Sequence, residues 1–157
     1  MKRLLLISLL LIFSIKILAQ GPGTVSGFPF LSDKFATIDL DYGVYCDQRF
    51  GIPKDKTYKW TPTKISIRNA GKYKDCVVSI TSPDKRLNRL KYENLNMVKC
   101  NLGEGNVEFC FRNQQGVAVL VLRYDKHRKL LQAVVYFVRE KDRGNYFELT
   151  NNDKILG

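Results

Sequence analysis

Histidine is almost absent from this chain, with His127 as the only one among 157 residues. Any mechanism that needs a serine–histidine–aspartate set or a cysteine–histidine pair must therefore use His127, and any that needs two histidines is excluded. The four cysteines form no Cys-x-x-C motif and lie far from His127 in sequence, which argues against a zinc site. We therefore expect no metal, no cofactor and no catalytic residues.

Long apolar runs are also scarce, and the longest lies at the N-terminus. Residues 4–15 are almost entirely apolar, but Lys16 interrupts them well short of the roughly 20 residues that a membrane-spanning helix needs. Two basic residues precede the run and the small residue Ala19 follows it, as is typical of a secretory signal peptide over residues 1–19. An uncleaved membrane anchor is the alternative. We expect a secreted or periplasmic protein.

Cleavage after Ala19 would remove three basic residues and no acidic one. The net charge would fall from +11 to +8, and 138 of the 157 residues would remain, the usual size of one domain. We expect a flexible leader at 20–34, a domain at 35–150 and a polar tail at 151–157, with no membrane span in the mature chain. The positive charge favours an anionic surface or polymer, or another protein, as partner; a lysine-rich surface that serves solubility is the alternative.

The mature chain shows short runs of alternating apolar and polar residues, which indicate antiparallel β-structure. In the first run Ile38, Leu40, Tyr42, Val44 and Cys46 share one face. The residues between 82 and 90 allow either a short helix or a loop between strands. The predicted strands are 37–47, 58–68, 75–81, 97–102, 107–112, 117–122, 130–138 and 146–149.

Two hairpins follow from this pattern. In the first, a turn over 103–106 would pair Leu102 with Val107, and this register places Cys100 opposite Phe109. In the second, residues 117–138, both strands are apolar on both faces, so that both faces should be covered. A loop or the 82–96 segment would then pack on the outer face. The alternative is an exposed apolar patch that docks a partner or forms a homo-oligomer.

The positions of the cysteines limit how they can pair. Cys46, Cys76 and Cys100 fall on the apolar faces of their strands, whereas Cys110 falls on the other face. A disulfide cannot join opposite faces of a sheet without a bulge, so we expect no Cys100–Cys110 bond and favour Cys46–Cys76. Four reduced cysteines in the core are the alternative.

Several residues are candidates for binding or chemistry. His127 could act as an acid with Glu108 or Glu148 as the base in a small secreted hydrolase, although no spacing favours such a pair. Trp60 is expected in the core or on a sheet surface and could instead stack on a sugar ring. A possible anion-binding face would form if the basic clusters converge: Lys85, Arg86 and Arg89, then Lys126, His127, Arg128 and Lys129, and a third cluster over 139–143.

The run from Gly116 to Asp125, followed by residues 129–139, resembles the closing hairpin of bacterial Ig-like domains. The resemblance extends over residues 97–139 and implies a binding or scaffold role. We therefore expect an antiparallel, Ig-like β-sandwich of about seven or eight strands. The expected function is an exported, non-enzymatic binding or structural module. The alternatives are a small, nuclease-like secreted hydrolase that acts on an anionic substrate, and a secreted effector or inhibitor.

Overall fold

The computed structural model describes residues 35–47, 57–138 and 144–151. The predicted signal peptide (1–19), the leader (20–34) and all but the first residue of the predicted tail lie outside these ranges. Within them, no helix is long and apolar enough to cross a membrane. The elements are β1 (Phe35–Cys46), β2 (Lys59–Arg68), the 3-10 helix η2 (Ala70–Lys72), β3 (Cys76–Thr81), β4 (Lys91–Gly103), β5 (Asn106–Arg112), β6 (Ala118–Tyr124), β7 (Leu130–Tyr136) and β8 (Tyr146–Thr150).

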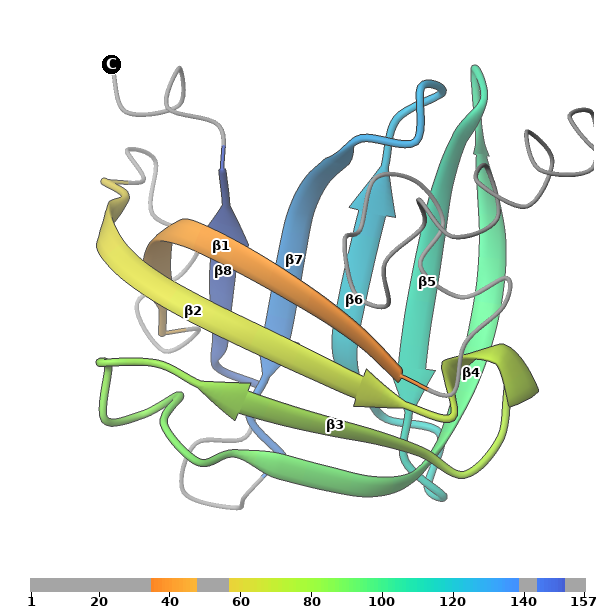
Figure 1. The fold of residues 1–157 in the computed structure, drawn as a ribbon, viewed down its shortest axis with the longest axis horizontal. Helices are drawn as coiled ribbons and strands as arrows, with labels where there is room; N and C mark the ends of the chain where they lie inside the picture. The colour runs from red at the N-terminus through yellow and green to blue at the C-terminus, as the bar shows by residue number, and fades with distance from the viewer. Residues whose placement is uncertain (1–34, 48–56, 139–143, 152–157) are drawn as a thin grey trace, which may run out of the picture.

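The eight strands form a closed barrel, so the prediction of an Ig-like sandwich is wrong. Each strand pairs antiparallel with its neighbour in sequence, and β8 pairs back with β1. Figure 1 shows why the two architectures share one sequence pattern: β1, β2 and β3 run crosswise over β5 to β8, so that the barrel strands form two layers as in a sandwich. Alternation along a strand is the same in a sandwich and in a barrel. The pairing of β8 with β1 distinguishes them.

Closure depends on β1, which is long enough to pair with both of its neighbours. Its residues 35–43 pair with β2, and its residues 42–46 pair with β8. Gly43 lies in the overlap, opposite Leu149, at a place where a side chain would collide with β8. β1 can therefore turn from one layer to the other while it stays hydrogen-bonded to both.

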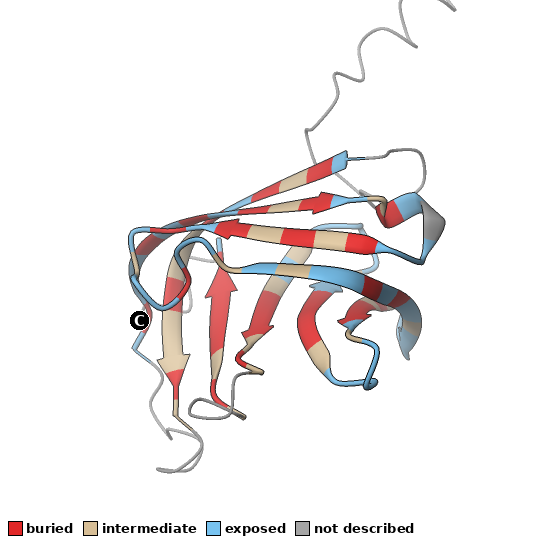
Figure 2. Cartoon of the chain, turned by 90° about the horizontal axis from the view of Figure 1, so that it is seen from below, coloured by how far each residue is buried: buried red, intermediate tan, exposed pale blue. Residues whose placement is uncertain are grey.

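Buried and exposed residues alternate along most strands, and the buried ones fill the barrel (Figure 2). The largest fully buried side chains include Tyr124 and Phe111, which belong to the adjacent strands β6 and β5. Tyr92 of β4 reaches β7, where its hydroxyl donates to the backbone oxygen of Tyr136 at 3.1 Å. The interior is therefore a packed core, as the width of an eight-stranded barrel allows.

A bulge in the β1–β2 pair reverses the predicted face of the second half of β1. The register shifts between Leu40 and Tyr42. Leu40 is buried in the core, and a Cβ on Gly43 would point at Phe147 and Leu149, so two inward positions lie three residues apart. Strict alternation cannot produce that spacing. Tyr42 and, after it, Val44 and Cys46 therefore lie on the outer face, not on the face of Ile38 and Leu40.

The predicted register of the first hairpin is also wrong by one residue. Cys100 pairs with Glu108 and Lys99 with Phe109, because the register shifts between Asn101 and Gly103. Glu104 and Gly105 both have positive φ, at 51° and 81°, and form a two-residue turn in place of the predicted four-residue one. Leu102 becomes the extra residue of a bulge and is exposed.

The other predicted strands are confirmed within a few residues, but β4 begins at Lys91, six residues before the predicted start. The predicted helix over 82–90 is wrong and the alternative loop is correct, because the segment forms consecutive turns. The N–H groups of Leu87 and Asn88 both donate to the Asp84 carbonyl, at 3.1 and 2.9 Å. Leu87 is fully buried, so this segment covers one end of the barrel core.

Candidate functional site at one end of the barrel

The connections between strands alternate between the two ends of the barrel. The β3–β4, β5–β6 and β7–β8 connections lie at the end where β1 finishes, which we call the pocket end. The β2–β3, β4–β5 and β6–β7 connections lie at the opposite end. Most of the buried polar side chains of the described ranges, including Thr61, Ser82 and Asn145, come from strand ends or connections at the pocket end.

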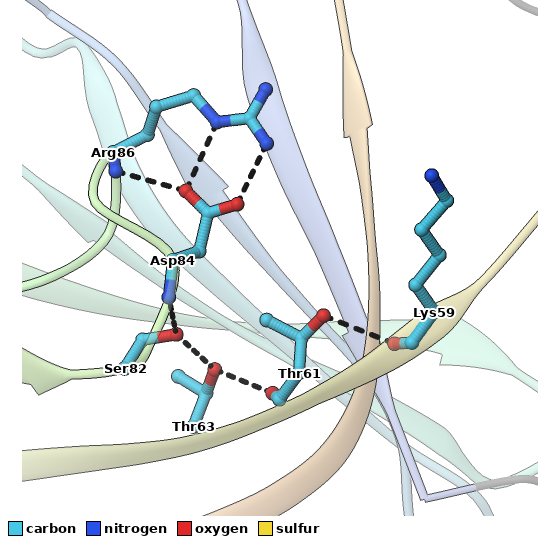
Figure 3. A network of polar contacts seen from close by, with 6 residues as sticks. All are labelled: Lys59, Thr61, Thr63, Ser82, Asp84 and Arg86. Carbon is cyan, nitrogen blue, oxygen red and sulfur yellow. Dashed lines mark hydrogen bonds and ion pairs between the residues drawn. The ribbon is translucent and has the colours of Figure 1, made fainter.

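A hydrogen-bonded network fixes the β3–β4 turn to β2 at the pocket end (Figure 3). The Thr63 hydroxyl donates to the Thr61 carbonyl at 2.8 Å and lies 3.0 Å from the Ser82 hydroxyl. The Asp84 N–H donates to the Ser82 hydroxyl at 3.3 Å. Buried hydroxyls thus have partners on both elements, which holds the turn in one position. The figure draws Lys59, Thr61, Thr63, Ser82, Asp84 and Arg86.

Arg86 completes this network and stacks on two rings. Its Nε and Nη2 donate to the two carboxylate oxygens of Asp84, at 3.0 and 2.7 Å. Its guanidinium carbon lies 4.2 Å from the ring centre of Tyr45 and 5.2 Å from that of Phe147. The hydrogen bonds from Arg86 lower the pKa of the Asp84 carboxyl, and the same pair raises the pKa of Arg86. Arg86 therefore holds the β3–β4 turn against the rings of Tyr45 and Phe147.

A pocket of about 350 Å³ opens between the β5–β6 and β7–β8 connections. The turn on one side is rigid, because the Asn113 side chain accepts the Val117 N–H at 2.9 Å and the Asn113 carbonyl accepts the Gly116 N–H at 2.9 Å. The volume lies in the usual range for small-molecule pockets. Most of the lining is apolar, with two amides and a phenol. The lining residues are Asn113, Gln115, Val117, Ala118, Tyr136, Phe137, Val138 and Gly144.

Next to the pocket, the outer face of β5 to β8 carries a second apolar layer. Cys110, Val121 and Val134 pair in one row across these strands, and all three are buried. Both faces of the 117–138 hairpin are therefore covered at this row, as predicted, and this row is not an open patch. The 82–96 segment is not the cover that we expected, because its Leu87 and Leu95 lie in the barrel core.

A buried carboxylate continues that row. Glu148 pairs with Val134 and is only 6% exposed. The Tyr58 hydroxyl donates to a Glu148 carboxylate oxygen. Burial, and then this hydrogen bond, raise the pKa of Tyr58. Beside them, burial and the thiol of Cys46 raise the pKa of Tyr146 to about 12. A carboxylate on an outer sheet face is thus held by a phenol in a site largely removed from water.

The two described basic clusters do not converge. Lys85, Arg86 and Arg89 belong to the β3–β4 turn at the pocket end, whereas Lys126 to Lys129 belong to the β6–β7 turn at the opposite end. The third cluster falls within 139–143, outside the described residues. A single anion-binding face built from the first two clusters is therefore not formed. At the pocket end, Lys85 and Arg89 are exposed, while Arg86 is bound to Asp84.

The structure does not assemble the acid–base pair that the sequence allowed. His127 lies in the turn that precedes Leu130, the first residue of β7. Val134, the partner of Glu148, is four residues further along β7, or about 13 Å of strand. Glu108 accepts a 2.8 Å hydrogen bond from Arg123 instead. His127 is exposed, and its N–H donates to the Asp125 carboxylate, which also accepts the Lys129 N–H.

All four cysteines are free. The favoured Cys46–Cys76 pair is wrong, because Cys46 ends β1 at the pocket end and Cys76 begins β3 at the opposite end. The shifted register places Cys100 and Cys110 on one outer face, since Cys100 pairs with Glu108 and Cys110 with Val98. The face argument against a Cys100–Cys110 bond therefore fails, although the two thiols are diagonal and not opposite.

Within the described ranges, no group of three histidine, cysteine, aspartate or glutamate side chains lies close enough to hold a metal ion. Comparison of the chain with protein-family models, with curated proteins and with solved structures found no match. The sequence analysis missed the pocket, whose walls come from connections about 20 residues apart that the β6–β7 pairing brings together.

Proposed function

We propose that this chain is an exported, non-enzymatic binding module, and that its pocket end takes up a small ligand or part of a partner. The pocket between the β5–β6 and β7–β8 connections supports this proposal most directly. The barrel interior is filled by side chains, so a ligand would bind at the end and not inside. Apolar walls with a few polar groups are the usual composition of a binding pocket.

The charge of the protein suggests which ligands it would prefer. The mature chain would carry a net charge of +8, and Lys85 and Arg89 are exposed in a turn at the same end as the pocket. A positive surface raises the local concentration of anions. The expected ligand therefore has an apolar or aromatic body with a negative group.

A fluorescent probe of that chemistry tests the proposal. We expect 8-anilinonaphthalene-1-sulfonate, an anion with two aromatic parts, to bind residues 20–157 at one saturable site. Ala118→Leu narrows the pocket and should weaken binding by about tenfold or more. Leu131→Ser is the control, since Leu131 is 43% exposed on the same hairpin and does not line the pocket. Circular dichroism would show that each variant is folded.

A matched pair of charges tests the polarity of the site. Val117 lines the pocket and is partly exposed. Val117→Glu should weaken binding of the anionic probe, whereas Val117→Lys, with a side chain of similar length, should preserve or strengthen it. Equal affinity for all variants, or loss of binding in Leu131→Ser alone, would show that the probe binds elsewhere and would refute the proposal.

A further inference from the structure

A pair of aromatic rings lies on the outer surface of β1 and β2, on strands that do not line the pocket. Tyr42 and Trp60 are register partners, with ring centres 5.4 Å apart and planes at 78°. Trp60 is 65% exposed, the highest value among the large exposed hydrophobic residues of the described ranges. A ligand that covered this indole would remove apolar area from water, which favours binding.

The β1 bulge is what brings the two rings together. Without the bulge, Tyr42 would lie two residues after Leu40 on the same face of β1, and its side chain would point into the barrel. With it, Tyr42 lies outside and supports Trp60 from the neighbouring strand. Bulges often redirect a side chain toward a functional surface. The bulge is further fixed by Asn151, whose side chain accepts the Asp41 N–H at 2.8 Å and donates to the Asp39 carbonyl at 2.9 Å.

Polar groups of both signs lie further along the same outer face, four residues of β2 or about 13 Å of strand from Trp60. Lys64 lies two positions beyond Pro62 on the outer face of β2, and its Nζ is 3.8 Å from Asp39 in an exposed pair. An ammonium donates hydrogen bonds to a hydroxyl, and a carboxylate accepts them. This pair carries no net charge, so it gives a polyanion such as nucleic acid no electrostatic advantage over a neutral ligand.

We propose that Trp60 and Tyr42 form a stacking platform for a pyranose ring of an uncharged glycan. The C–H groups on one face of a pyranose carry partial positive charge and meet the negative face of an aromatic ring. The hydroxyls of sugars further along the glycan would exchange hydrogen bonds with the exposed Lys64 and Asp39. This site is independent of the pocket, which is lined by other strands.

The experiment uses Trp60 itself as the reporter, because it is the only tryptophan of the chain. Residues 20–157 are titrated with cellohexaose, maltohexaose and chitohexaose, while the indole emission and the indole N–H resonance are followed. We expect saturable changes with at least one of them. Trp60→Ala should weaken binding by about tenfold or more in calorimetry, and Trp60→Phe should retain part of it.

Tyr73→Ala is the matched control, since Tyr73 is exposed beside η2 at the opposite end of the barrel and should not affect binding. Three results would overturn the proposal. The first is that none of the three oligosaccharides changes the Trp60 signals. The second is that binding persists unchanged in Trp60→Ala. The third is that oligothymidylate, and no oligosaccharide, binds in a Trp60-dependent manner.

Discussion

Substitution of Gly43 by alanine tests barrel closure directly. A Cβ at this position would lie 2.8 Å from Cδ2 of Leu149 and 2.9 Å from Cε1 of Phe147, well inside van der Waals contact. Overpacking of this kind costs about 1–3 kcal/mol. Alanine also lowers the conformational entropy of the unfolded chain, which offsets about 0.4–1 kcal/mol of this loss of stability. We therefore expect a net loss of about 1–2 kcal/mol, or a fall in Tm of about 3–8 °C for a domain of this size.

Urea unfolding of residues 20–157, followed by circular dichroism, measures this loss. Leu149→Ala alone should cost about 2–5 kcal/mol, because Leu149 is fully buried. In the Leu149→Ala background the space for a Cβ at residue 43 is larger, so Gly43→Ala should cost clearly less than in the wild type. If Gly43→Ala is neutral within about 0.5 kcal/mol, or if the two losses add, then β1 does not pack on β8.

Three further predictions concern polar contacts at the pocket end and the pairing of the cysteines. Tyr58→Phe removes the donor to buried Glu148 and should destabilise the fold by about 1–3 kcal/mol at pH 7. Because the folded state raises the Tyr58 pKa, the wild type should lose stability as the pH rises above about 10, and Tyr58→Phe should lose less over that range in urea unfolding. Arg86→Lys replaces a two-pronged contact with a single one and should lower stability by about 1 kcal/mol in thermal unfolding. Peptide mapping without reductant should find no bond between Cys46 and Cys76, and finding one would contradict the barrel topology.

Local patterns were sufficient to predict where the strands lie. Each of the eight predicted segments overlaps a strand, because alternation of apolar and polar residues reflects which face of a strand meets the core. β4 was the least accurate, since its first six residues include only Leu95 as a buried position. A strand that is exposed on both faces over several residues has no alternation to detect.

Closure of the sheet was not predictable from the same patterns. The pairing of β1 with β8 joins residues 100 to 108 positions apart, and nothing in the sequence of either segment identifies the other as its partner. The Tyr58–Glu148 contact depends on this closure, because β1 is the strand that joins the β2 side of the sheet to β8. The sequence did contain one signal, a glycine in the middle of a long strand, which often marks a close approach of backbone.

The two register errors have a common physical cause, and it bears on where this protein could bind anything. Each arises at a bulge, and one extra residue exchanges the inner and outer faces of everything beyond it. A filled barrel can recognise a ligand only at its ends or on its outer surface. Ligand recognition must therefore depend on the outward-facing residues, whose identity is not constrained by packing in the core. The first bulge places Tyr42 on the outer face, where its ring contacts Trp60. The same irregularity that made the alternation pattern mispredict the faces of β1 therefore forms the proposed aromatic platform.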